Sequence, residues 1–455
     1  MLGFFPSSLP PRKVGSMNRP SVLVLIALLP FSVAAVQAQS PESPQSIDPL
    51  GRPRVVTATN PKHVAKSKLQ EPSQTPARPA EVPAKLVEGS PRQQPEESKS
   101  SVKQDEALAV SHRLSPVRIR MRIEEAERLM KVRVLPTAMS VPSIDYVTLA
   151  ALLPETSHIH LIRIAKQTFL TRGGEFSAMT SFGLPVQIHI VRANGVNTAV
   201  TVFDEKNRSL VPLVVEFPIE RRGQFREMAY YTSAHPALLS PEVLKAGQTY
   251  VNSMIDLAAK RLRERGVPIA SNLIDVAKHL CVVEHVDHDR FRNENRIALF
   301  EEIYSLYGLN QLDTYRYSVS SAGAGGMVQM IPWAYQLERQ RHPGVGLNPD
   351  FVLGMRNHGN ALEAMLLYMK DTWDDLLANE DVQAAITAKQ ATPPELMAAA
   401  YNSNAAKLPG YIRRAGAGWR TLIPRETQIY LQIYQSLDVL MKSKANHSKL
   451  QNREP

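Results

Sequence analysis

One short stretch of the chain concentrates residue types that let a backbone approach a bound molecule. It runs Ser320-Ser-Ala-Gly-Ala-Gly-Gly-Met-Val-Gln329-Met-Ile-Pro332, with small residues and glycines over 322–326. Glycine adopts positive φ without a steric penalty and allows close approach to a ligand. Gln329 is an amide inside an apolar, helix-compatible run, and a buried amide without a partner is costly. We therefore expect Gln329 to have a hydrogen-bonding task in the wall of a binding site.

Upstream, an apolar helical pattern ends in a carboxylate. The sequence His279-Leu-Cys-Val-Val-Glu284-His places Glu284 directly after two valines. Apolar neighbours raise the pKa of a carboxyl group, so that it stays protonated and can act as a general acid. Taken alone, Glu284 is most simply a solvated carboxylate at the end of a helix, and its candidacy as a catalytic acid rests on the segments that follow it.

Two further segments follow in order, Ala399-Ala-Tyr401-Asn402 and Pro424-Arg-Glu426-Thr427-Gln-Ile-Tyr430. Together with the glycine-rich stretch they resemble the signatures of lytic transglycosylases, lysozyme-like enzymes that cut the glycan of bacterial cell walls. The resemblance covers roughly residues 272–441. It implies a helical lysozyme-like domain in which one glutamate acts first as acid and then as base, while the sugar's own 6-hydroxyl closes an anhydro ring. It also implies supporting or substrate-binding roles for Ser320, Met327, Gln329, Tyr401, Asn402, Glu426 and Tyr430.

The position of the acid departs from the family pattern. In most members the glutamate precedes the serine by about nine residues, and counting back from Ser320 gives Gln311, which cannot transfer a proton. Taken alone, Gln311 would indicate an inactive glycan-binding or scaffolding protein on the same fold. We favour Glu284, with residues 292–315 as an inserted helix and loop. A hydrolytic lysozyme-like glycosidase is a third hypothesis, and it would use a second carboxylate.

Other candidate groups have simpler interpretations. Glu301 and Glu302 lie in an amphipathic helical pattern, which favours a solvated face. Cys281 and His285 are four residues apart, and acidic and histidine residues follow, so a zinc site is conceivable. Such a site needs at least three ligands in good geometry, and a structural thiol beside a solvated loop is the interpretation we prefer. We expect no metal and no other cofactor.

The pattern of elements predicts an α+β chain. Residues 115–239 read as a small antiparallel β-rich module, with a helix at 123–130 and an Asn194-Gly195 two-residue hairpin turn. Residues 240–445 read as the helical domain. Ser240-Pro241 starts its first helix, Gly266 stops it, and Ser271 caps the next. The expected strands are 186–190, 197–203 and 210–217, and the expected later helices are 296–307, 360–378, 394–401 and 425–441.

The N-terminal residues predict export. Basic residues precede an apolar run over 22–36, and Val36-Gln-Ala38 offers a cleavage site, so residues 1–38 read as a signal peptide. An uncleaved anchor is the alternative. Proline-rich residues 39–114 read as a disordered linker, and 446–455 as a tail. We expect a location in the periplasm or cell envelope after transport across the inner membrane.

The net charge of +10 favours polyanionic partners. No nucleic-acid-binding pattern stands out, so nucleic acid is not an expected partner. The expected partners are peptidoglycan glycan strands, with cell-envelope proteins docking through the β-rich module.

Overall fold

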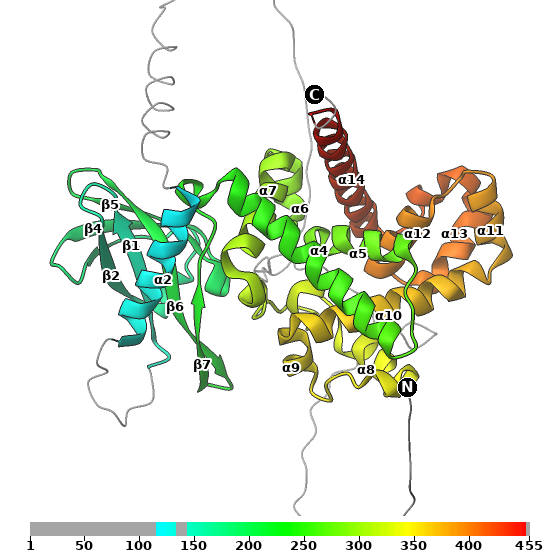
Figure 1. Ribbon diagram of the computed structural model, residues 1–455, viewed down its shortest axis with the longest axis horizontal. Coiled ribbons are helices and arrows are strands. Elements are labelled where there is room, and N and C mark those ends of the chain that lie inside the picture. Colours follow the sequence, from blue (N-terminus) through cyan, green and yellow to red (C-terminus); the bar gives the residue numbers. More distant parts are fainter. Residues whose placement is uncertain (1–114, 133–142, 452–455) are drawn as a thin grey trace, which may run out of the picture. The chain divides into compact units, whose positions relative to one another are not determined.

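The computed structural model describes residues 115–132 and 143–451, in which an antiparallel sheet precedes a helical region (Figure 1). The α+β prediction is confirmed at this level. The expected signal peptide, the expected linker and the last four residues lie outside the described residues. Within the described ranges, no helix combines the length and the apolar character needed to cross a membrane.

The sheet has seven strands, each antiparallel to its neighbours, in the order β2-β1-β6-β5-β4-β3, with β7 paired to β6. The strands are β1 (Tyr146–Leu153), β2 (His158–Ala165), β3 (Glu175–Met179), β4 (Pro185–Arg192), β5 (Ala199–Asp204), β6 (Ser209–Arg221) and β7 (Gln224–Tyr231). The short helix α3 (Lys166–Phe169) follows β2.

Strand β1 is buried on both faces, and its alternating side chains enter two different cores. Ala150 and Leu152 pack with helix α2 (Pro116–Val132), which covers one face of the sheet through Ile119, Ile123, Ala126 and Met130. Leu149 and Leu153 enter the core on the opposite face. The apolar run of β1 therefore follows from its position between two packed layers.

One expected turn has a different form. Strands β4 and β5 do pair as a hairpin, but the link between them is longer than the two-residue turn predicted at Asn194-Gly195. It spans residues 193–198 and contains a 3₁₀ turn over Gly195–Asn197. The Thr198 hydroxyl accepts from the Asn194 amide at 3.0 Å and donates to the Gly195 carbonyl at 2.8 Å. Thr198 thus closes a wider loop, which becomes important at the site below.

The helical region contains the expected helices, most of them longer than predicted. The expected ones are α4 (Pro241–Glu264), α5 (Ser271–Val283), α7 (Arg296–Asn310), α10 (His358–Leu377), α12 (Pro393–Asn402) and α14 (Arg425–Gln451). The sequence did not predict α6 (His288–Asn293), α8 (Pro332–Arg341), α9 (Phe351–Arg356), α11 (Glu380–Thr387) or α13 (Leu408–Ala415). Helix α14 extends through the first part of the expected tail.

The ends of α4 and α5 test the capping predictions. The Ser240 hydroxyl accepts from the amide of Val243 at 3.2 Å, and Gly266 has φ +83° just after α4. Both expectations are confirmed. The prediction for Ser271 was wrong, because Ser271 is the first helical residue and Ala270 occupies the cap without a side-chain bond.

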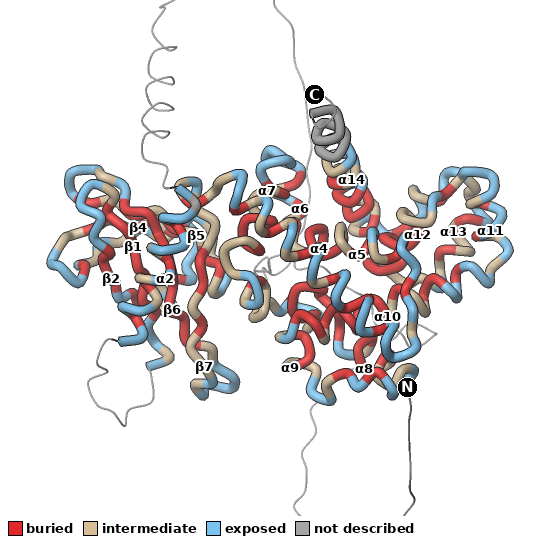
Figure 2. The backbone as a smooth tube through the Cα atoms, viewed as in Figure 1, coloured by how far each residue is buried: buried red, intermediate tan, exposed pale blue. Residues whose placement is uncertain are grey.

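Helix α10 lies in the core of the helical region, and Figure 2 shows it largely buried. It contacts α5, α8 and α12, and α14 packs on α5 and α12. The buried face of α5 includes Leu273, Val276, Ala277 and Leu280, as the periodicity predicts. These contacts fix the C-terminal end of α5, where Glu284 lies.

Helices α4 and α7 cross closely at two glycines. A Cβ on Gly247 would overlap the carbonyl oxygen of Tyr304, and one on Gly308 would overlap that of Val243. Helix α7 also reaches the sheet, since Leu306 belongs to the core that β1 and β6 form. The side chain of Asn310 exchanges two hydrogen bonds with the backbone of Thr232, at 2.8 and 2.9 Å. Helix α7 therefore links the sheet to the helical region.

Candidate active site

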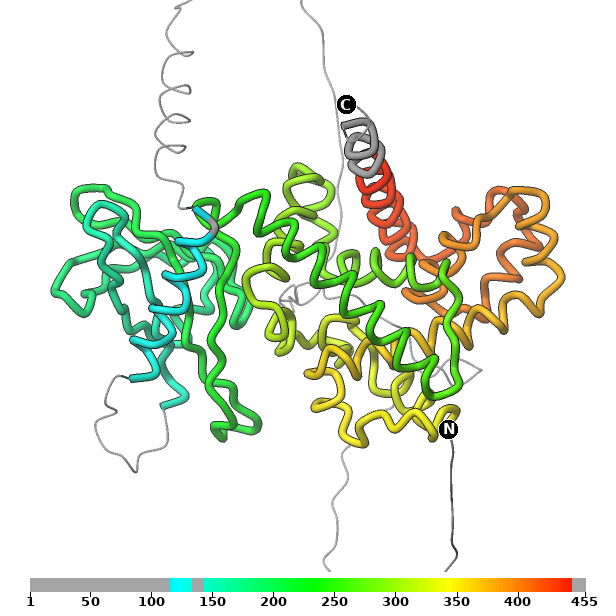
Figure 3. Tube along the Cα trace, in the orientation of Figure 1, coloured from blue at the N-terminus to red at the C-terminus, as the bar shows by residue number. Residues whose placement is uncertain are grey.

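Glu284 directly follows α5 and is almost completely buried, with 6% of its surface exposed. Its Oε1 accepts a hydrogen bond of 2.5 Å from the hydroxyl of Tyr430 on α14. Oε2 is also buried and has no hydrogen-bond partner among the residues that the structure describes. Figure 3 shows these two helices, distant in sequence, packed together.

This environment changes the acidity of Glu284. Burial raises its pKa to about 8, the bond from Tyr430 opposes that rise, and the negative charge of Glu426 adds to it. A carboxyl group with this pKa is mostly protonated at neutral pH. Glu284 therefore has the proton that a general acid needs, as the two preceding valines predicted.

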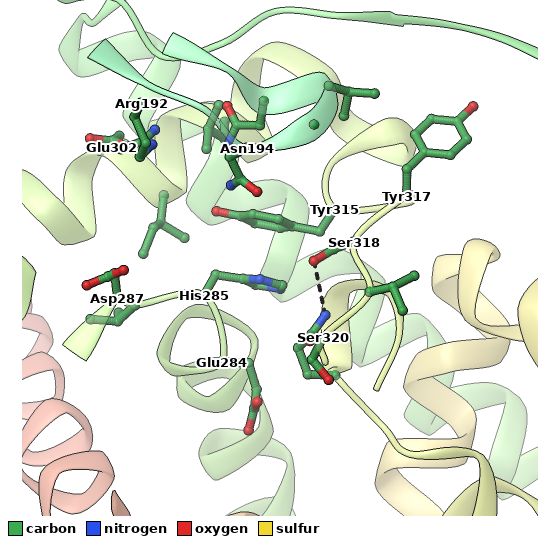
Figure 4. A pocket seen from close by; sticks show the side chains of 18 of the residues that line it. Arg192, Asn194, Glu284, His285, Asp287, Glu302, Tyr315, Tyr317, Ser318 and Ser320 are labelled. Atoms are coloured by element: carbon green, nitrogen blue, oxygen red, sulfur yellow. Dashed lines mark hydrogen bonds and ion pairs between the residues drawn. The ribbon is translucent and has the colours of Figure 1, made fainter. Parts of the chain in front are cut away.

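A pocket of about 460 Å³ contains Glu284 in its lining. Ser320 and Gln329 of the glycine-rich stretch also line it, as do His285 and Tyr315. The opposite wall comes from the sheet, through the β4–β5 loop that includes Asn194 (Figure 4). The structure thus brings the predicted acid, serine and amide to one pocket, and it adds a wall that the sequence did not predict.

The glycine-rich stretch forms a compact turn. Ser320 closes it, because its hydroxyl accepts from the amide of Ala324 at 3.0 Å and its own amide donates to the carbonyl of Ala324 at 2.8 Å. Gly326 has φ +69°, and a Cβ there would overlap the carbonyl oxygen of Met355. Glycine is required at this position for both reasons.

Gln329 stabilises the same turn. Its Nε2 donates to the carbonyl of Gly326 at 2.8 Å and to the hydroxyl of Ser318 at 3.2 Å. Its Oε1 is buried and lacks a partner within the described part of the chain. Gln329 itself is left-handed, with φ 44°. The residue types after the glycines are compatible with a helix, but only a 3₁₀ turn (Gly326–Val328) forms before α8.

His285 connects this turn to the end of α5. Its Nε2 donates to the carbonyl of Met327 at 2.9 Å, and its ring stacks on Tyr315 with 3.4 Å between centroids. Burial lowers the pKa of His285 to about 3, although the bond to Met327 opposes this shift, so the ring is neutral. Figure 4 shows the Glu284 carboxyl group directed away from this ring pair. His285 therefore positions the wall of the pocket, and Met327 contributes through its backbone.

The remaining predicted residues lie around Glu284 in different ways. The hydroxyl of Tyr401 donates to the carbonyl of Val328 at 2.7 Å, and the nearby Glu284 charge contributes to a raised Tyr401 pKa, after burial. Asn402 is buried, and neither polar atom of its side chain has a partner in the described ranges. Glu426 is partly buried and acts on Glu284 through its charge.

Gln311 lies away from this arrangement. It is exposed at the C-terminal end of α7, with φ 47°, and it does not line the pocket. The residues between Glu284 and Ser320 form α6, α7 and a loop. Of the two positions considered for the acid, Glu284 lines the pocket and Gln311 does not.

The expectation of a solvated face was wrong for Glu302. Its carboxylate receives two hydrogen bonds from Arg290, at 3.1 and 2.8 Å, and pairs with Arg192 of β4 at 2.9 Å. Burial alone would raise the pKa of Glu302, but the bonds from Arg290 and the charges of both arginines lower it below its usual value. Glu302 lines the pocket as an ionised group that joins α7 to the sheet.

Cys281 and His285 do not form a metal site. Cys281 is fully buried in α5, where burial raises the pKa of its thiol, and the Nε2 atom of His285 binds Met327. The cluster of potential metal ligands found in the described residues lies elsewhere, at Glu338, His342 and Asp371.

Sequence reasoning missed the contributions of Tyr315, Ser318 and the β4–β5 loop to the pocket. Of these, only the β4–β5 loop showed a pattern in the sequence, the Asn194-Gly195 pair. That pair predicted a turn, but it did not predict that the turn would line the pocket. Comparison with known protein families, with curated proteins and with solved structures found no match for this chain.

Proposed function

We propose that this protein is a peptidoglycan lytic transglycosylase on a lysozyme-like fold, with Glu284 as its single acid and base. The observation that carries the proposal is the state of this carboxyl group. Its Oε1 is held by Tyr430, its Oε2 has no partner among the described groups, and burial raises its pKa to about 8. A lone protonated carboxyl group of this kind suits cleavage of a glycosidic bond.

The reaction has two proton transfers and no water. Oε2 of Glu284 gives its proton to the oxygen that links C1 of N-acetylmuramic acid to the next sugar, and the C1–O bond breaks. The resulting carboxylate then takes the proton of the muramic 6-hydroxyl, whose oxygen bonds to C1 and closes the anhydro ring. The hydroxyl of Tyr430 stabilises the carboxylate between the two steps, since its hydrogen bond lowers the pKa of Glu284.

Unpaired amides near Glu284 are the groups best suited to hold a sugar. Gln329 lines the pocket, and its buried Oε1 atom lacks a partner in the described structure. Asn402 follows Tyr401 on α12, and both polar atoms of its side chain are also buried without partners there. Buried amide groups of this kind gain most when a ligand supplies the missing hydrogen bond. Sugar hydroxyl and N-acetyl groups offer both donors and acceptors.

Access to Glu284 requires movement of the pocket lining. Both Glu284 and its Oε2 atom are buried, so a glycan cannot touch the acid in the arrangement described. The β4–β5 loop is the wall that comes from a separate element of the fold. We therefore assign this part of the β-rich module a role in admitting or positioning the glycan.

Hydrolysis would use a second carboxylate as base or nucleophile. The other two acidic residues that line the pocket are both engaged. Asp287 caps α6 by accepting from the amides of Asp289 and Arg290, and Glu302 binds two arginines. This arrangement favours internal ring closure over attack by water.

The cellular setting forms part of the proposal. A peptidoglycan substrate places the enzyme in the periplasm or cell envelope, after export by the signal peptide expected over residues 1–38. The positive net charge suits an anionic wall polymer. Cell-envelope proteins remain the proposed partners of the β-rich module.

Digestion of purified bacterial sacculi tests the proposal. The full chain should release fragments with 1,6-anhydromuramoyl ends, and Glu284→Gln should release none while keeping the same circular dichroism spectrum. Gln311→Asn is the matched control and should keep wild-type activity. Reducing muramic ends would identify a hydrolase, and binding to sacculi without release of fragments would identify a non-catalytic protein.

A further inference from the structure

A second buried glutamate lies between α8 and α10, apart from the candidate active site. Glu338 is fully buried on α8, and neither of its carboxylate oxygens has a hydrogen-bond partner in the described parts of the chain. His342 follows at i+4, just after the helix, and Asp371 faces both from α10. Residues four apart on a helix share one face.

The distances within this cluster suit a metal ion. His342 Nε2 lies 3.0 Å from Asp371 Oδ2 and 3.7 Å from Glu338 Oε2, and the three ligand atoms all lie within 4.8 Å of one another. Bonds of about 2.0–2.2 Å in a tetrahedral site would place neighbouring ligand atoms roughly 3.3–3.6 Å apart. The observed separations lie on either side of that range, so small side-chain rotations suffice for coordination.

The local charge also favours a cation. Glu338 and Asp371 are close together, and Asp375 is near enough for its charge to act on Glu338. Arg341 opposes these charges and lies 3.4 Å from Asp371. Burial, then the charge of Asp371, raises the pKa of Glu338 to about 8. A buried carboxylate without donors needs either a proton or a positive ion, and a bound cation would replace the proton.

We propose that Glu338, His342 and Asp371 bind one divalent metal ion, with zinc as the preferred ion. One imidazole and two carboxylates form a mixed nitrogen and oxygen set, which suits zinc better than calcium or magnesium. The side chains of His342 and Asp371 are 16% exposed. This opening gives the ion a route in and leaves a fourth position for water.

The bound ion would connect two elements that position the candidate active site. Helix α8 follows the glycine-rich turn directly, and α10 packs on both α5 and α8. Its role is therefore structural, since the three ligands tie α8 to the core helix and Glu284 lies outside the cluster.

Zinc titration of the full chain tests the site. The protein is prepared without a histidine tag, treated with chelator and dialysed. The binding of added ZnCl₂ is then measured by calorimetry, and its effect on Tm by thermal unfolding, at pH 7.5. We expect one zinc ion per chain and a rise in Tm, with no comparable effect of Ca²⁺ or Mg²⁺. Co²⁺ should bind in the same place and give visible absorption bands.

Variants distinguish this cluster from other surface histidines. Glu338→Gln and Asp371→Asn should each weaken zinc binding by at least about 100-fold, because loss of a direct ligand exceeds the effect of an outer partner. Asp374→Asn is the control, since Asp374 lies on the same helix but pairs with Lys370, and it should bind zinc as the wild type does. Equal zinc affinity in wild type and Glu338→Gln, or no binding by the wild type, would overturn the proposal. If Glu338→Gln fails to fold, Asp371→Asn decides between the same outcomes.

Discussion

Glu284 and Glu338 are the same residue type in equally buried positions, and their surroundings differ. Burial raises the pKa of each to about 8. Glu284 accepts a hydrogen bond from Tyr430 and lines a pocket. Glu338 has no donor in the described structure except a histidine at 3.7 Å, and another carboxylate lies beside it. A raised pKa therefore indicates a candidate functional site, but it does not show which chemistry that site performs. Beside Glu284, the hydroxyl of Tyr430 leaves the carboxyl group with a proton that it can transfer. Beside Glu338, His342 and Asp371 are groups that can bind a cation together with it.

The largest expected effect separates the two glutamates by activity. Glu284→Gln should lower the release of anhydromuramoyl fragments by about 10³-fold or more, because general acid catalysis contributes about 10²- to 10⁴-fold and here one residue acts twice. The same variant should keep the zinc-dependent rise in Tm. A Glu284→Gln protein that loses zinc binding would show that the two sites are not independent.

The free energy of unfolding should depend on pH through the titration of both Glu284 and Glu338. Each folded-state pKa of about 8 lies above the ordinary value of 4.5, so the folded chain binds more protons than the unfolded chain between these pH values. The stabilisation is therefore complete below pH 4.5 and is lost as the pH rises toward 8. Denaturant unfolding in chelator should show this decline, of about 1–3 kcal/mol for each group.

Glu338→Gln sharpens this measurement. The substitution should remove only the part of the pH-dependent loss of stability that comes from Glu338. In chelator at pH 8, the variant should therefore be more stable than wild type by about 1–3 kcal/mol. Saturating zinc should restore wild-type stability at pH 8 and leave the variant unchanged. An identical pH decline in both proteins would mean that Glu338 does not titrate in this range.

A smaller effect is expected from the partner of Glu284. Tyr430→Phe removes the hydrogen bond that lowers the pKa of Glu284. The high-pH limb of the activity profile should therefore move upward by about one pH unit, equal to about 1.4 kcal/mol, while activity below pH 7 falls. A limb that stays in place would show that Glu284 is not the group titrating there.

The smallest effect concerns Glu302, a partly buried carboxylate that does have cationic partners. Glu302→Gln should destabilise the fold by about 1 kcal/mol, because Arg290 and Arg192 lose a charged acceptor. Glu294→Gln is the control. Glu294 pairs with the same Arg290 from a more exposed position, so its loss should cost less than about 0.5 kcal/mol. Chemical unfolding at pH 7 measures both.

Local sequence patterns predicted the helix that ends at Glu284 and the start of α4. The apolar periodicity of α5 and the two valines before Glu284 predicted a helix that ends in a buried carboxyl group, and the cap at Ser240 was found where expected. Residue type did not decide the conformation of the run after the glycines. Its apolar residues are compatible with a helix, but Gly326 and Gln329 both adopt positive φ, so only a short turn forms.

Contacts between distant elements were beyond prediction from the sequence. Glu338 and His342 show the spacing of a shared helix face, but Asp371 joins them only because α10 packs against α8. In the same way, nothing in the β4–β5 loop indicated that it would line the same pocket as Glu284. Strand β1 shows no alternation of apolar and polar residues, because both of its faces are buried, and it was therefore not predicted as a strand.

Helix α7 has a consequence for how this protein could be rearranged in evolution. Its Leu306 belongs to the core of the sheet, its Asn310 binds the backbone of Thr232, and its Gly308 fits against α4. A transfer of the sheet to another protein would therefore have to include α7. The sheet and α7 should be gained or lost together, as a single heritable unit.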